Sequence, residues 1–264
     1  MNHKLTGKVA LVTGAGSGIG RATALLLAER GARIAALGFT KSRLEETAAI
    51  IKDKQTADHA LVLQADISDY AALETAVSQI INQWGRLDIV FANAGINGVW
   101  APLEELDPDE WQKTIRVNLT GTFFTLKTAV PYLKKQGGSI IITASVNGTR
   151  IFSNTGATAY SATKAGQVAI AKMLALELAK HRIWVNAICP GAIATNIEEN
   201  TEKQDVAEAR EPVNYPAGRI PLTDGQPGTA AEVAELVAFL ASDAARHITG
   251  TEVWIDGAES LLQG

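Results

Sequence analysis

Short apolar runs alternate with longer amphipathic stretches along almost the whole chain, and this alternation predicts the secondary structure. Seven runs have the length and the β-branched content of buried strands. They are Val9–Thr13, Arg33–Leu37, Ala60–Gln64, Ile89–Asn93, Ser139–Ser145, Trp184–Cys189 and Thr251–Ile255. Six helical patterns separate them, of which the clearest are Ile19–Arg30, Ser42–Lys54, Tyr70–Trp84, Ala159–Lys180 and Ala230–Ala241. Gly31 and Gly85 stand just past two of these helices, where glycine commonly ends a helix.

Strands that are separated by helices pair in parallel, because each connection must cross over the sheet. Right-handed crossovers on both faces predict an α/β fold, a doubly wound Rossmann domain whose seven-stranded parallel sheet has helices on both faces. We expect one domain over residues 1–264, since no linker or internal repeat interrupts the alternation. The long irregular segment Gly191–Thr229 follows the sixth strand and is a candidate lid over the ligand site.

Composition narrows the class of protein. The 264 residues are 47% hydrophobic and 20% charged, which is enough apolar material for a large core and excludes a disordered or fibrous chain. Lys+Arg number 24 against 28 Asp+Glu, without the basic excess of a dedicated nucleic-acid binder. No apolar run approaches the roughly 18 residues of a membrane span. Nucleic acid and membrane are therefore not expected partners.

The start of the chain and its single cysteine indicate the compartment. Met1–Gly7 leads directly into a predicted strand and has no apolar core of a signal peptide. Cys189 is the one cysteine, so it forms no internal disulfide and fits no metal-ligand spacing. We expect a protein of the reducing cytoplasm that needs no metal.

A glycine-rich turn, Thr13–Gly20, joins the first strand to the first helix. Glycines permit a tight turn and let backbone N–H groups approach a pyrophosphate, and the helix N-terminus adds partial positive charge. A strand before the turn and a helix after it predict a dinucleotide site. The spacing Gly14-x3-Gly18-x-Gly20 departs from G-x-G-x-x-G and is similar to the turn of the short-chain dehydrogenase/reductase family.

Further landmarks follow in that family's order between Lys8 and Gly257. They are Asn93-Ala94-Gly95 after the fourth strand, Asn118, Ser145 closing the fifth strand, Tyr160-Ser161-Ala162-Thr163-Lys164 opening a long helix, and Pro190-Gly191 after the sixth strand. The resemblance implies an NAD(P)-dependent oxidoreductase with the catalytic residues Asn118, Ser145, Tyr160 and Lys164. The cofactor-binding residues that it implies are Gly14, Ser17, Gly18, Ile19, Gly20, Gly38, Phe39, Thr40, Asp66, Ile67, Asn93, Ala94, Gly95, Tyr160, Lys164, Pro190, Gly191, Ile193 and Thr195.

The chemistry of Tyr160 and Lys164 supports these roles independently. Four residues apart on a helix they share one face, and a nearby ammonium is expected to lower the pKa of a phenol from its usual value near ~10. Ser145, at the carboxyl edge of the sheet, is placed to hydrogen-bond a carbonyl oxygen beside Tyr160. The structural alternatives are a half-buried tyrosine with a solvated lysine, and a serine that simply terminates its strand.

Asn118 and the histidines are the remaining candidates for a role in catalysis. By resemblance, Asn118 kinks its helix and holds a water that links Lys164 to solvent; the alternative is a helix-interior asparagine bonded to local backbone. No histidine is placed to activate Ser145, and the motif Gly-x-Ser-x-Gly is absent around it, so a serine hydrolase is a poor alternative.

The choice of cofactor depends on the end of the second strand. Relatives that prefer NAD usually carry an acid there, but this chain has Gly38, and no carboxylate appears before Glu45. Thr40, Ser42 and the helix amides are suited to a 2′-phosphate, with Lys41 or Arg43 adding charge. We therefore favour NADP(H). NAD(H) stays possible, because Phe39 stands where NADP-preferring relatives often have arginine.

Other residues bear on the cofactor and the substrate. Asp66 resembles the family aspartate at the adenine edge, or it is a turn acceptor or N-cap before the next helix. By resemblance, Ile193 and Thr195 approach the nicotinamide carboxamide. The loop Asn147–Gly156 belongs to a connection two residues longer than we expect for the family. The segment Thr195–Gly228 carries a mixed set suited to closing over a ligand: Asn196, Glu198, Glu199, Asn200, Val213, Tyr215 and Pro216.

The favoured function is an NADPH-dependent carbonyl reductase that interconverts a ketone or aldehyde and an alcohol. One alternative is a 3-oxoacyl-[acyl-carrier-protein] reductase, with Lys134, Lys135, Lys180, His181 and Arg182 as a basic docking patch. Another is an NAD-dependent sugar or polyol dehydrogenase. A non-catalytic dinucleotide sensor and a methyltransferase are weaker alternatives. The tail Trp254–Gly264, with apolar Leu261 and Leu262, resembles the segment that relatives pack in a homotetramer, although docking on its own subunit is the alternative.

Overall fold

Seven parallel strands form the central sheet, as predicted, in the order β11-β7-β6-β4-β1-β2-β3. The computed structural model describes residues 4–55, 57–195, 201–207, 209–210, 213, 215 and 218–262. The strands of the sheet are β1 (Val9–Thr13), β2 (Arg33–Gly38), β3 (Ala60–Gln64), β4 (Ile89–Ala92), β6 (Gly138–Thr143), β7 (Ile183–Pro190) and β11 (Glu252–Ile255). One boundary corrects a prediction: β6 ends at Thr143, so Ser145 lies just beyond the strand and does not close it.

The first strand, β1, lies inside the sheet and pairs with β2 on one side and with β4 on the other. The chain therefore winds outward first in one direction and then in the other. The crevice at the carboxyl ends of β1 and β4 is the switch point at which doubly wound folds bind their ligands.

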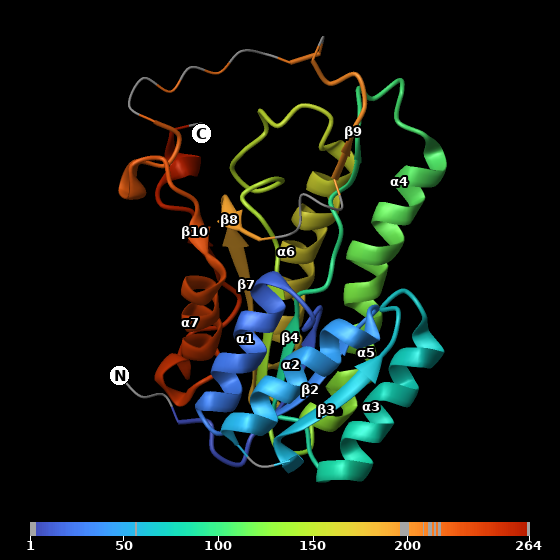
Figure 1. Cartoon of the computed structure of the whole chain (residues 1–264), viewed down its shortest axis with the longest axis vertical. Helices are drawn as coiled ribbons and strands as arrows, with labels where there is room; N and C mark the ends of the chain where they lie inside the picture. The colour runs from blue at the N-terminus through green and yellow to red at the C-terminus, as the bar shows by residue number, and fades with distance from the viewer. Residues whose placement is uncertain are drawn as a thin grey trace.

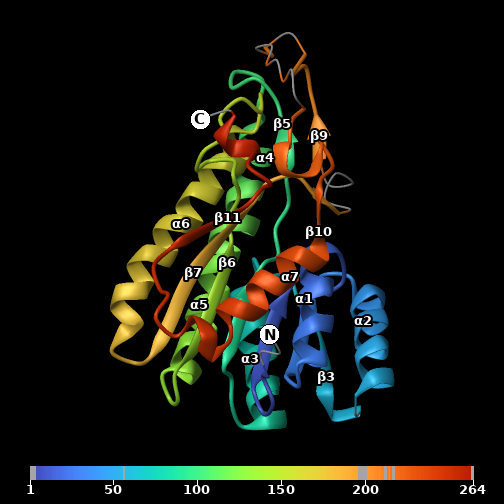
Figure 2. The ribbon, with the colours of Figure 1, turned by 90° about the vertical axis from the view of Figure 1, so that its left-hand side faces the viewer.

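Seven α-helices of the described chain cover the two faces of the sheet. They are α1 (Gly18–Glu29), α2 (Lys41–Lys54), α3 (Tyr70–Trp84), α4 (Pro108–Thr114), α5 (Gly121–Leu133), α6 (Thr158–Ala179) and α7 (Ala230–Leu240). A π-helix, Ile115–Thr120, joins α4 to α5. One apolar core packs α1, α2 and α7 against the sheet, and a second core packs α3, α5 and α6 against its other face (Figure 2).

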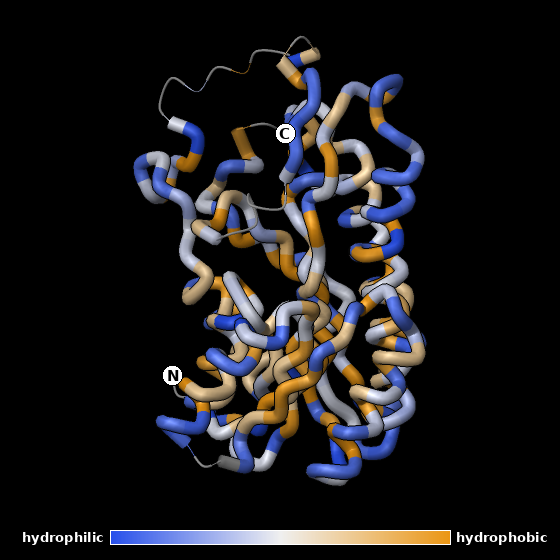
Figure 3. The backbone as a smooth tube through the Cα atoms, turned by 45° about the vertical axis from the view of Figure 1, so that its right-hand side comes forward, coloured by the Kyte–Doolittle hydropathy of each residue, from blue (hydrophilic) through white to orange (hydrophobic). Residues whose placement is uncertain are grey.

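Local sequence explains where these helices begin and end. The Asp69 carboxylate accepts the Ala72 N–H at 3.0 Å and caps α3, which ends at Gly85 in the left-handed conformation with φ 73°. Thr229 and Glu232 form a capping box at the start of α7. The tube of Figure 3 is mostly hydrophobic along the central strands, because strands buried on both faces need apolar side chains throughout.

Four short strands above the carboxyl edge of the sheet were not predicted. β5 (Gly98–Trp100) pairs with β9 (Thr201–Lys203), and β8 (Ile193–Ala194) pairs with β10 (Gly228–Thr229). In Figure 1 they lie on the same side of the sheet as the C-terminus. The segment Gly191–Thr229 is thus not irregular throughout, since it contributes three of these strands and a 3-10 turn, Pro221–Thr223. Asn196, Glu198, Glu199, Asn200 and Pro216 lie outside the described residues.

Candidate active site

A cleft of about 1010 Å³ opens at the carboxyl edge of the sheet, at the switch point between β1 and β4. This volume matches the upper end of the usual range for small-molecule sites, roughly 300–1,000 Å³. Of the residues predicted for catalysis or cofactor binding, all but Gly20 and Asn118 line this cleft. The sequence therefore predicted one contiguous site from residues spread between β1 and β8.

The glycine turn forms the floor of the cleft at the start of α1. Gly14 and Gly18 have positive φ values of 69° and 49°, which side chains rarely adopt. Gly20 has a different role from the predicted one. A Cβ at Gly20 would lie 2.1 Å from the Gly14 carbonyl oxygen, so this glycine lets α1 pack against the turn from behind.

Thr195 lines the cleft directly beside the glycine turn. A Cβ at Gly18 would lie 3.3 Å from Thr195 Cβ and Cγ2. Gly191 and Ile193, from the same loop, also line the cleft. Thr195 and Ile193, which are predicted to approach the nicotinamide carboxamide, thus lie in the cleft near the glycine turn.

The Asn93 side chain joins the carboxyl ends of three strands. Its Nδ2 donates to the Thr13 carbonyl at 3.1 Å, and its Oδ1 accepts from Thr143 Oγ1 at 3.1 Å. The Thr13 hydroxyl accepts the backbone N–H groups of Asn93 and Ala94 at 2.9 and 3.0 Å. The side-chain amide of Asn93, a predicted cofactor residue, thus holds the carboxyl ends of β1, β4 and β6 together at the rim of the cleft.

Ser145, Tyr160 and Lys164 meet in the cleft, as their predicted roles require. The Ser145 hydroxyl hydrogen-bonds the phenol of Tyr160 and accepts the Asn147 N–H at 3.1 Å. Lys164 Nζ donates to the Thr143 carbonyl at 2.8 Å and lies 5.4 Å from the centroid of the Tyr160 ring. Lys164 is only 4% exposed, which excludes the alternative of a solvated lysine.

Burial dominates the electrostatics of this group and corrects one prediction. Burial raises the pKa of Tyr160, and the hydrogen bond from Ser145 acts weakly in the opposite direction. The predicted lowering by Lys164 is not found, because the sequence does not reveal how strongly desolvation disfavours a phenolate. Burial also lowers the pKa of Lys164 to about 8, so its ammonium form is lost as the pH rises through that value.

Asn118 lies in the π-helix behind the cleft and is fully buried. Its Oδ1 accepts the Ile96 N–H and its Nδ2 donates to the Ile96 carbonyl, both at 2.8 Å. A Cβ at Gly95 would lie 3.0 Å from Asn118 Oδ1 and 3.8 Å from Lys164 Nζ, so the two side chains converge behind this glycine. The predicted distortion of the helix at Asn118 is observed as the π-helix.

The far end of the cleft contains the predicted adenosine region. Phe39 is 75% exposed beside Gly38 and Thr40. Lys41 pairs with Glu45 at 3.7 Å, whereas Arg43 lines the cleft and its Cβ would lie 3.0 Å from a Cβ at Gly16. Of the two candidate cations, Arg43 is the one beside the glycine turn.

Asp66 lines the cleft and also stabilises the turn after β3. Its Oδ1 accepts the Ser68 N–H at 2.8 Å. The N-cap of α3 is Asp69, so the predicted alternative of a turn acceptor is correct for Asp66 and the alternative of an N-cap is wrong.

Several lining residues were not predicted from the sequence, because non-local pairing brings them to the site. Trp100 comes from β5, and its ring centroid lies 6.4 Å from that of Tyr160. Glu259, in the C-terminal 3-10 turn Glu259–Leu261, is buried and accepts the Ala192 N–H at 3.1 Å. It also pairs with Arg219, and so ties the C-terminal tail to the loop after β7.

Two further predictions concern surfaces away from the cleft. The cations proposed as a carrier-protein docking patch surround the amino ends of β6 and β7, where Gly138 pairs with Ile183 and its N–H donates to the Arg182 carbonyl at 3.0 Å. This is the edge of the sheet opposite to the cleft. Leu261 and Leu262 are 70% and 51% exposed, so the alternative that they dock on their own subunit is wrong.

The part of the chain that the structure describes contains neither a metal cluster nor a membrane-spanning helix. Within this part of the chain, no group of three His, Cys, Asp or Glu side chains lies close enough to hold a metal ion. None of the described helices has the length and apolarity that crossing a membrane requires. Cys189 is buried and its pKa is raised to about 12, mainly by burial.

Comparison with known proteins decides the family. The family model described as enoyl-(acyl carrier protein) reductase matches residues 14–258. The chain belongs to the short-chain dehydrogenase/reductase family. It is an NAD(P)-dependent oxidoreductase of that family, and the methyltransferase alternative is excluded.

Similar proteins of the family cover almost the whole chain. A levodione reductase from Leifsonia aquatica is 37% identical over 265 residues, which span 97% of this chain and 96% of the relative. A crystal structure of a 3-ketoacyl-ACP reductase from Sinorhizobium meliloti 1021 is 56% identical, with a TM-score of 0.93, over 96% of this chain and 99% of that chain. A 3-ketoacyl-(acyl-carrier-protein) reductase from Brucella melitensis, complexed with NADH, is 32% identical with a TM-score of 0.85, over 97% of this chain and 100% of that chain.

The cleft fits the nicotinamide dinucleotide that this family uses. Its floor is made of glycines at which added Cβ atoms would collide with neighbouring backbone or fill the cleft, and its rim carries backbone N–H groups at the start of α1. The residues that would hold the dinucleotide extend from the glycine turn through Asp66 and the Asn93–Gly95 loop to Lys164 and Thr195.

Proposed function

We propose that this enzyme is an NADP(H)-dependent carbonyl reductase that interconverts a ketone or an aldehyde with the corresponding alcohol. The observation that carries the proposal is the Ser145–Tyr160–Lys164 group at the centre of a glycine-floored cleft. The bound nicotinamide supplies or accepts the hydride in this chemistry. The chain itself must position the carbonyl and move one proton.

The hydroxyls of Ser145 and Tyr160 bind the carbonyl oxygen of the substrate in this mechanism. When the carbonyl is reduced to an alcohol, its oxygen would take up the phenol proton of Tyr160, which would leave Tyr160 as a phenolate. We propose that the ammonium of Lys164, 5.4 Å from the ring centroid, interacts with the phenolate once it has formed, whereas burial outweighs any effect of Lys164 on the pKa of the resting phenol. Since burial raises the pKa of Tyr160, the phenol is protonated at neutral pH and can act as the proton donor.

In the proposed enzyme, Asn118 acts through its hydrogen bonds to the backbone of Ile96. Its amide holds Ile96 beside Gly95 and thereby keeps the wall of the cleft next to Lys164. We assign it the relay of protons between Lys164 and solvent, through water. This role is carried over from the family on the position of Asn118.

NADP(H) is favoured over NAD(H) for two reasons in the adenosine region. No carboxylate stands at Gly38 to repel a 2′-phosphate, and Arg43 lines the cleft beside the glycine turn. The complex of a relative with NADH keeps NAD(H) as the alternative. The cytoplasm is the proposed compartment, because the one cysteine is a buried thiol.

The remaining assignments concern domain organisation and assembly. We assign residues 1–264 to one catalytic domain and the segment 191–229 to a lid, on the support that β8–β10 and β5–β9 anchor this segment beside the cleft. A homotetramer is proposed because Leu261 and Leu262 remain exposed at the end of the chain.

A second candidate function is reduction of 3-oxoacyl groups on acyl carrier protein, favoured by the name of the relative that is 56% identical. The basic patch around Lys134 and Arg182 does not support this second function. The patch lies at the amino end of β6 and the cleft at its carboxyl end, so the length of this strand places them roughly 20 Å apart. Such a substrate would need another docking surface. The NAD-dependent sugar dehydrogenase stays a third possibility that the cofactor test addresses.

The experiment is a substrate panel under four cofactor conditions. Simple ketones, 3-oxoacyl thioesters, polyols and cyclic ketones are assayed with NADPH, NADH, NADP⁺ and NAD⁺ by absorbance at 340 nm. The proposal predicts reduction of free ketones with NADPH as the better donor. Turnover restricted to carrier-protein thioesters, or oxidation of polyols with NAD⁺ alone, would replace it by the corresponding alternative.

A further inference from the structure

A second, smaller cavity of about 210 Å³ adjoins the cleft beneath the segment that follows β9. It shares Trp100, Asn154, Lys203 and Arg219 with the main cleft, so the two spaces meet at these side chains. The Trp100 ring, 6.4 Å from the Tyr160 ring, stands at the junction. A substrate whose carbonyl lies at Tyr160 would therefore extend past Trp100 into this cavity.

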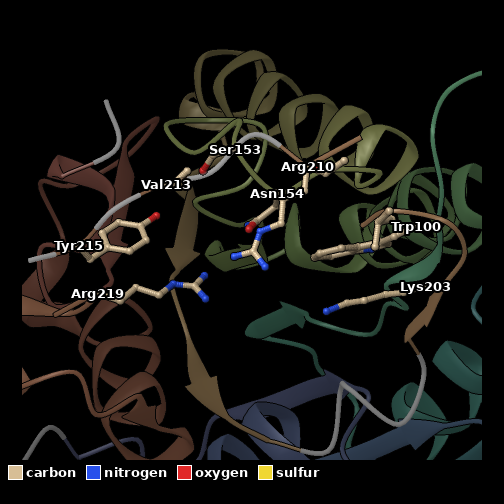
Figure 4. Close-up of a pocket in the computed structure, with 10 residues that line it drawn as sticks. Trp100, Ser153, Asn154, Lys203, Arg210, Val213, Tyr215 and Arg219 are labelled. Carbon is tan, nitrogen blue, oxygen red and sulfur yellow. The ribbon is translucent and has the colours of Figure 1, made fainter. Parts of the chain in front are cut away.

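Three cationic side chains reach this cavity, all from the stretch between β9 and the 3-10 turn Pro221–Thr223. Figure 4 shows Arg219 and Lys203 extending toward its middle from opposite sides, with the guanidinium of Arg210 between them. Among the described residues that line the cavity, none carries a carboxylate. The charged side chains among these described residues are therefore all positive, although the chain as a whole has a net charge of -4.

The pairing of these cations leaves a positive field in the cavity. Arg219 binds the buried Glu259 through Nε, so its charge is offset from behind by the tail of the chain. Lys203 Nζ lies 5.5 Å from the centroid of the Trp100 ring, which offsets only part of its charge. For Arg210, no ion pair with any described residue is found. Like charges that converge on one small space repel each other, and an anion between them converts this repulsion into attraction.

The uncharged lining is suited to an organic anion. Trp100 offers a flat apolar surface at the junction, and Asn154 and Tyr215 bring polar groups to the wall. Asn154 is held in place because its Nδ2 donates to Asn147 Oδ1 at 2.7 Å. Guanidinium groups bind carboxylates and phosphates through two parallel hydrogen bonds, which selects oxyanions over other anions.

We propose that this cavity is an anion subsite, and that the enzyme acts on carbonyl compounds carrying an oxyanion, a carboxylate or a phosphate, one ring or a short carbon chain from the reacting carbon. Lys203, Arg210 and Arg219 bind the oxyanion, and Trp100 packs on the intervening carbons. The inference rests on the proposed carbonyl reduction, because the second anchor of the substrate is the Ser145–Tyr160 pair.

The test compares an acid with its neutral ester in the wild-type protein and in an Arg210→Met variant. 4-Oxocyclohexanecarboxylate should have a kcat/KM at least about 10-fold above that of its methyl ester. Arg210→Met should lower kcat/KM for the acid by about 10-fold, mainly through KM, and change that for the ester less than 2-fold. Lys135→Met, at the opposite edge of the sheet, is the matched control and should leave both substrates unaffected. Hydroxyacetone phosphate, compared with hydroxyacetone, distinguishes a phosphate from a carboxylate as the preferred oxyanion.

Equal turnover of acid and ester in the wild type, or equal losses in Arg210→Met, would overturn the subsite. Calorimetric titration with 4-hydroxycyclohexanecarboxylate separates this failure from a failure of the proposed reaction. Binding that weakens about 10-fold in Arg210→Met supports the subsite even if no ketone is reduced. Binding that is absent in the wild type, or unchanged in the variant, contradicts it.

Discussion

Burial determines the acid–base properties of the residues at the centre of the cleft. A buried phenol favours its neutral form and a buried amine favours its neutral form as well, so Tyr160 titrates higher and Lys164 lower than in water. At neutral pH, Tyr160 is therefore a proton donor and Lys164 is still mainly an ammonium. Carbonyl reduction needs this combination of charge states.

The buried Lys164 should make the free energy of unfolding depend on pH in a defined window. Its pKa is about 8 in the folded protein against 10.5 for the ordinary side chain. Between these values the unfolded chain binds more protons, so the stability of the wild type rises with pH, by roughly 3 kcal/mol in total.

The Lys164→Met variant lacks this contribution. Urea denaturation at about pH 7.5, 9 and 10.5 should show the wild type gaining stability relative to Lys164→Met across the series. A difference between the two proteins that stays constant with pH would mean that Lys164 titrates normally in the fold.

The choice between NADP(H) and NAD(H) depends on one residue position in this account. A Cβ at Gly38 would meet only Leu44 Cδ2 within 3.4 Å, so an aspartate is accommodated there without displacing the backbone. Gly38→Asp should lower kcat/KM for NADPH by at least about 10-fold, because a carboxylate repels the 2′-phosphate, and should improve that for NADH. Initial rates with both cofactors measure this. Unchanged preference would place the discriminating position elsewhere.

At the scale of elements, the long strands and helices were predictable and the short ones were not. Buried parallel strands such as β1 read as unbroken apolar runs, and α3 carries both its cap Asp69 and its terminating Gly85 in sequence. β5 and β9 pair only through contacts between residues about a hundred positions apart, which no local pattern records. Trp100 and Lys203, and with them the second cavity, were missed for this reason.

The candidate site was likewise predictable only in part. The glycine turn and the Ser145, Tyr160 and Lys164 group were predicted because their spacing within local motifs carries the signal. The depth of burial, which reverses the expected pKa shift of Tyr160, arises from elements packed around the helix and not from the motif. Glu259 was missed because its partners Ala192 and Arg219 lie far away along the chain.

The π-helix at Asn118 should contribute measurably to stability. Asn118→Leu leaves the N–H and the carbonyl of Ile96 without their 2.8 Å partners in a buried location. We expect a loss of about 2–6 kcal/mol in the free energy of unfolding, at roughly 1–3 kcal/mol for each of the two unsatisfied groups. Chemical denaturation of the variant tests this.

A matched control for this element is Thr122→Val. It removes the 2.7 Å hydrogen bond from Thr122 Oγ1 to the Asn118 carbonyl and the 2.8 Å hydrogen bond from Gln167 Nε2 to Thr122 Oγ1, but Gln167 Nε2 still donates to the Asn118 carbonyl and Ile96 stays paired. Its cost should be about 1 kcal/mol. If Asn118→Leu were no more destabilising than Thr122→Val, the amide of Asn118 would not hold the wall of the cleft.

At the scale of the whole molecule, exposed apolar side chains are the basis of the proposed homotetramer. Leu261 and Leu262 end the chain in contact with solvent, and Met173 and Leu176 project from α6 in the same way. A monomer gains nothing from exposing these side chains, whereas their burial between copies contributes about 25 cal/mol per Å² of apolar surface.

The proposed tetramer can be tested at the tail. Replacing Leu261 and Leu262 together by aspartate should shift the protein to smaller species in sedimentation velocity, because buried carboxylates at an interface are costly. Leu103→Asp, at a similarly exposed leucine on the other side of the cleft, is the control and should leave the assembly unchanged. A wild type that sediments as a monomer would refute the tetramer directly.

The central claim is that Tyr160 supplies the proton for carbonyl reduction, and the Tyr160→Phe variant tests it most directly. Phenylalanine keeps the ring against Trp100 and Lys164 but removes the hydroxyl that hydrogen-bonds Ser145. The measurement is kcat for ketone reduction together with the dissociation constant of NADPH. The account predicts a loss of about 10²–10⁴-fold in kcat, the usual contribution of a general acid, with NADPH affinity within about 3-fold of the wild type. Turnover within a few-fold of the wild type would contradict it.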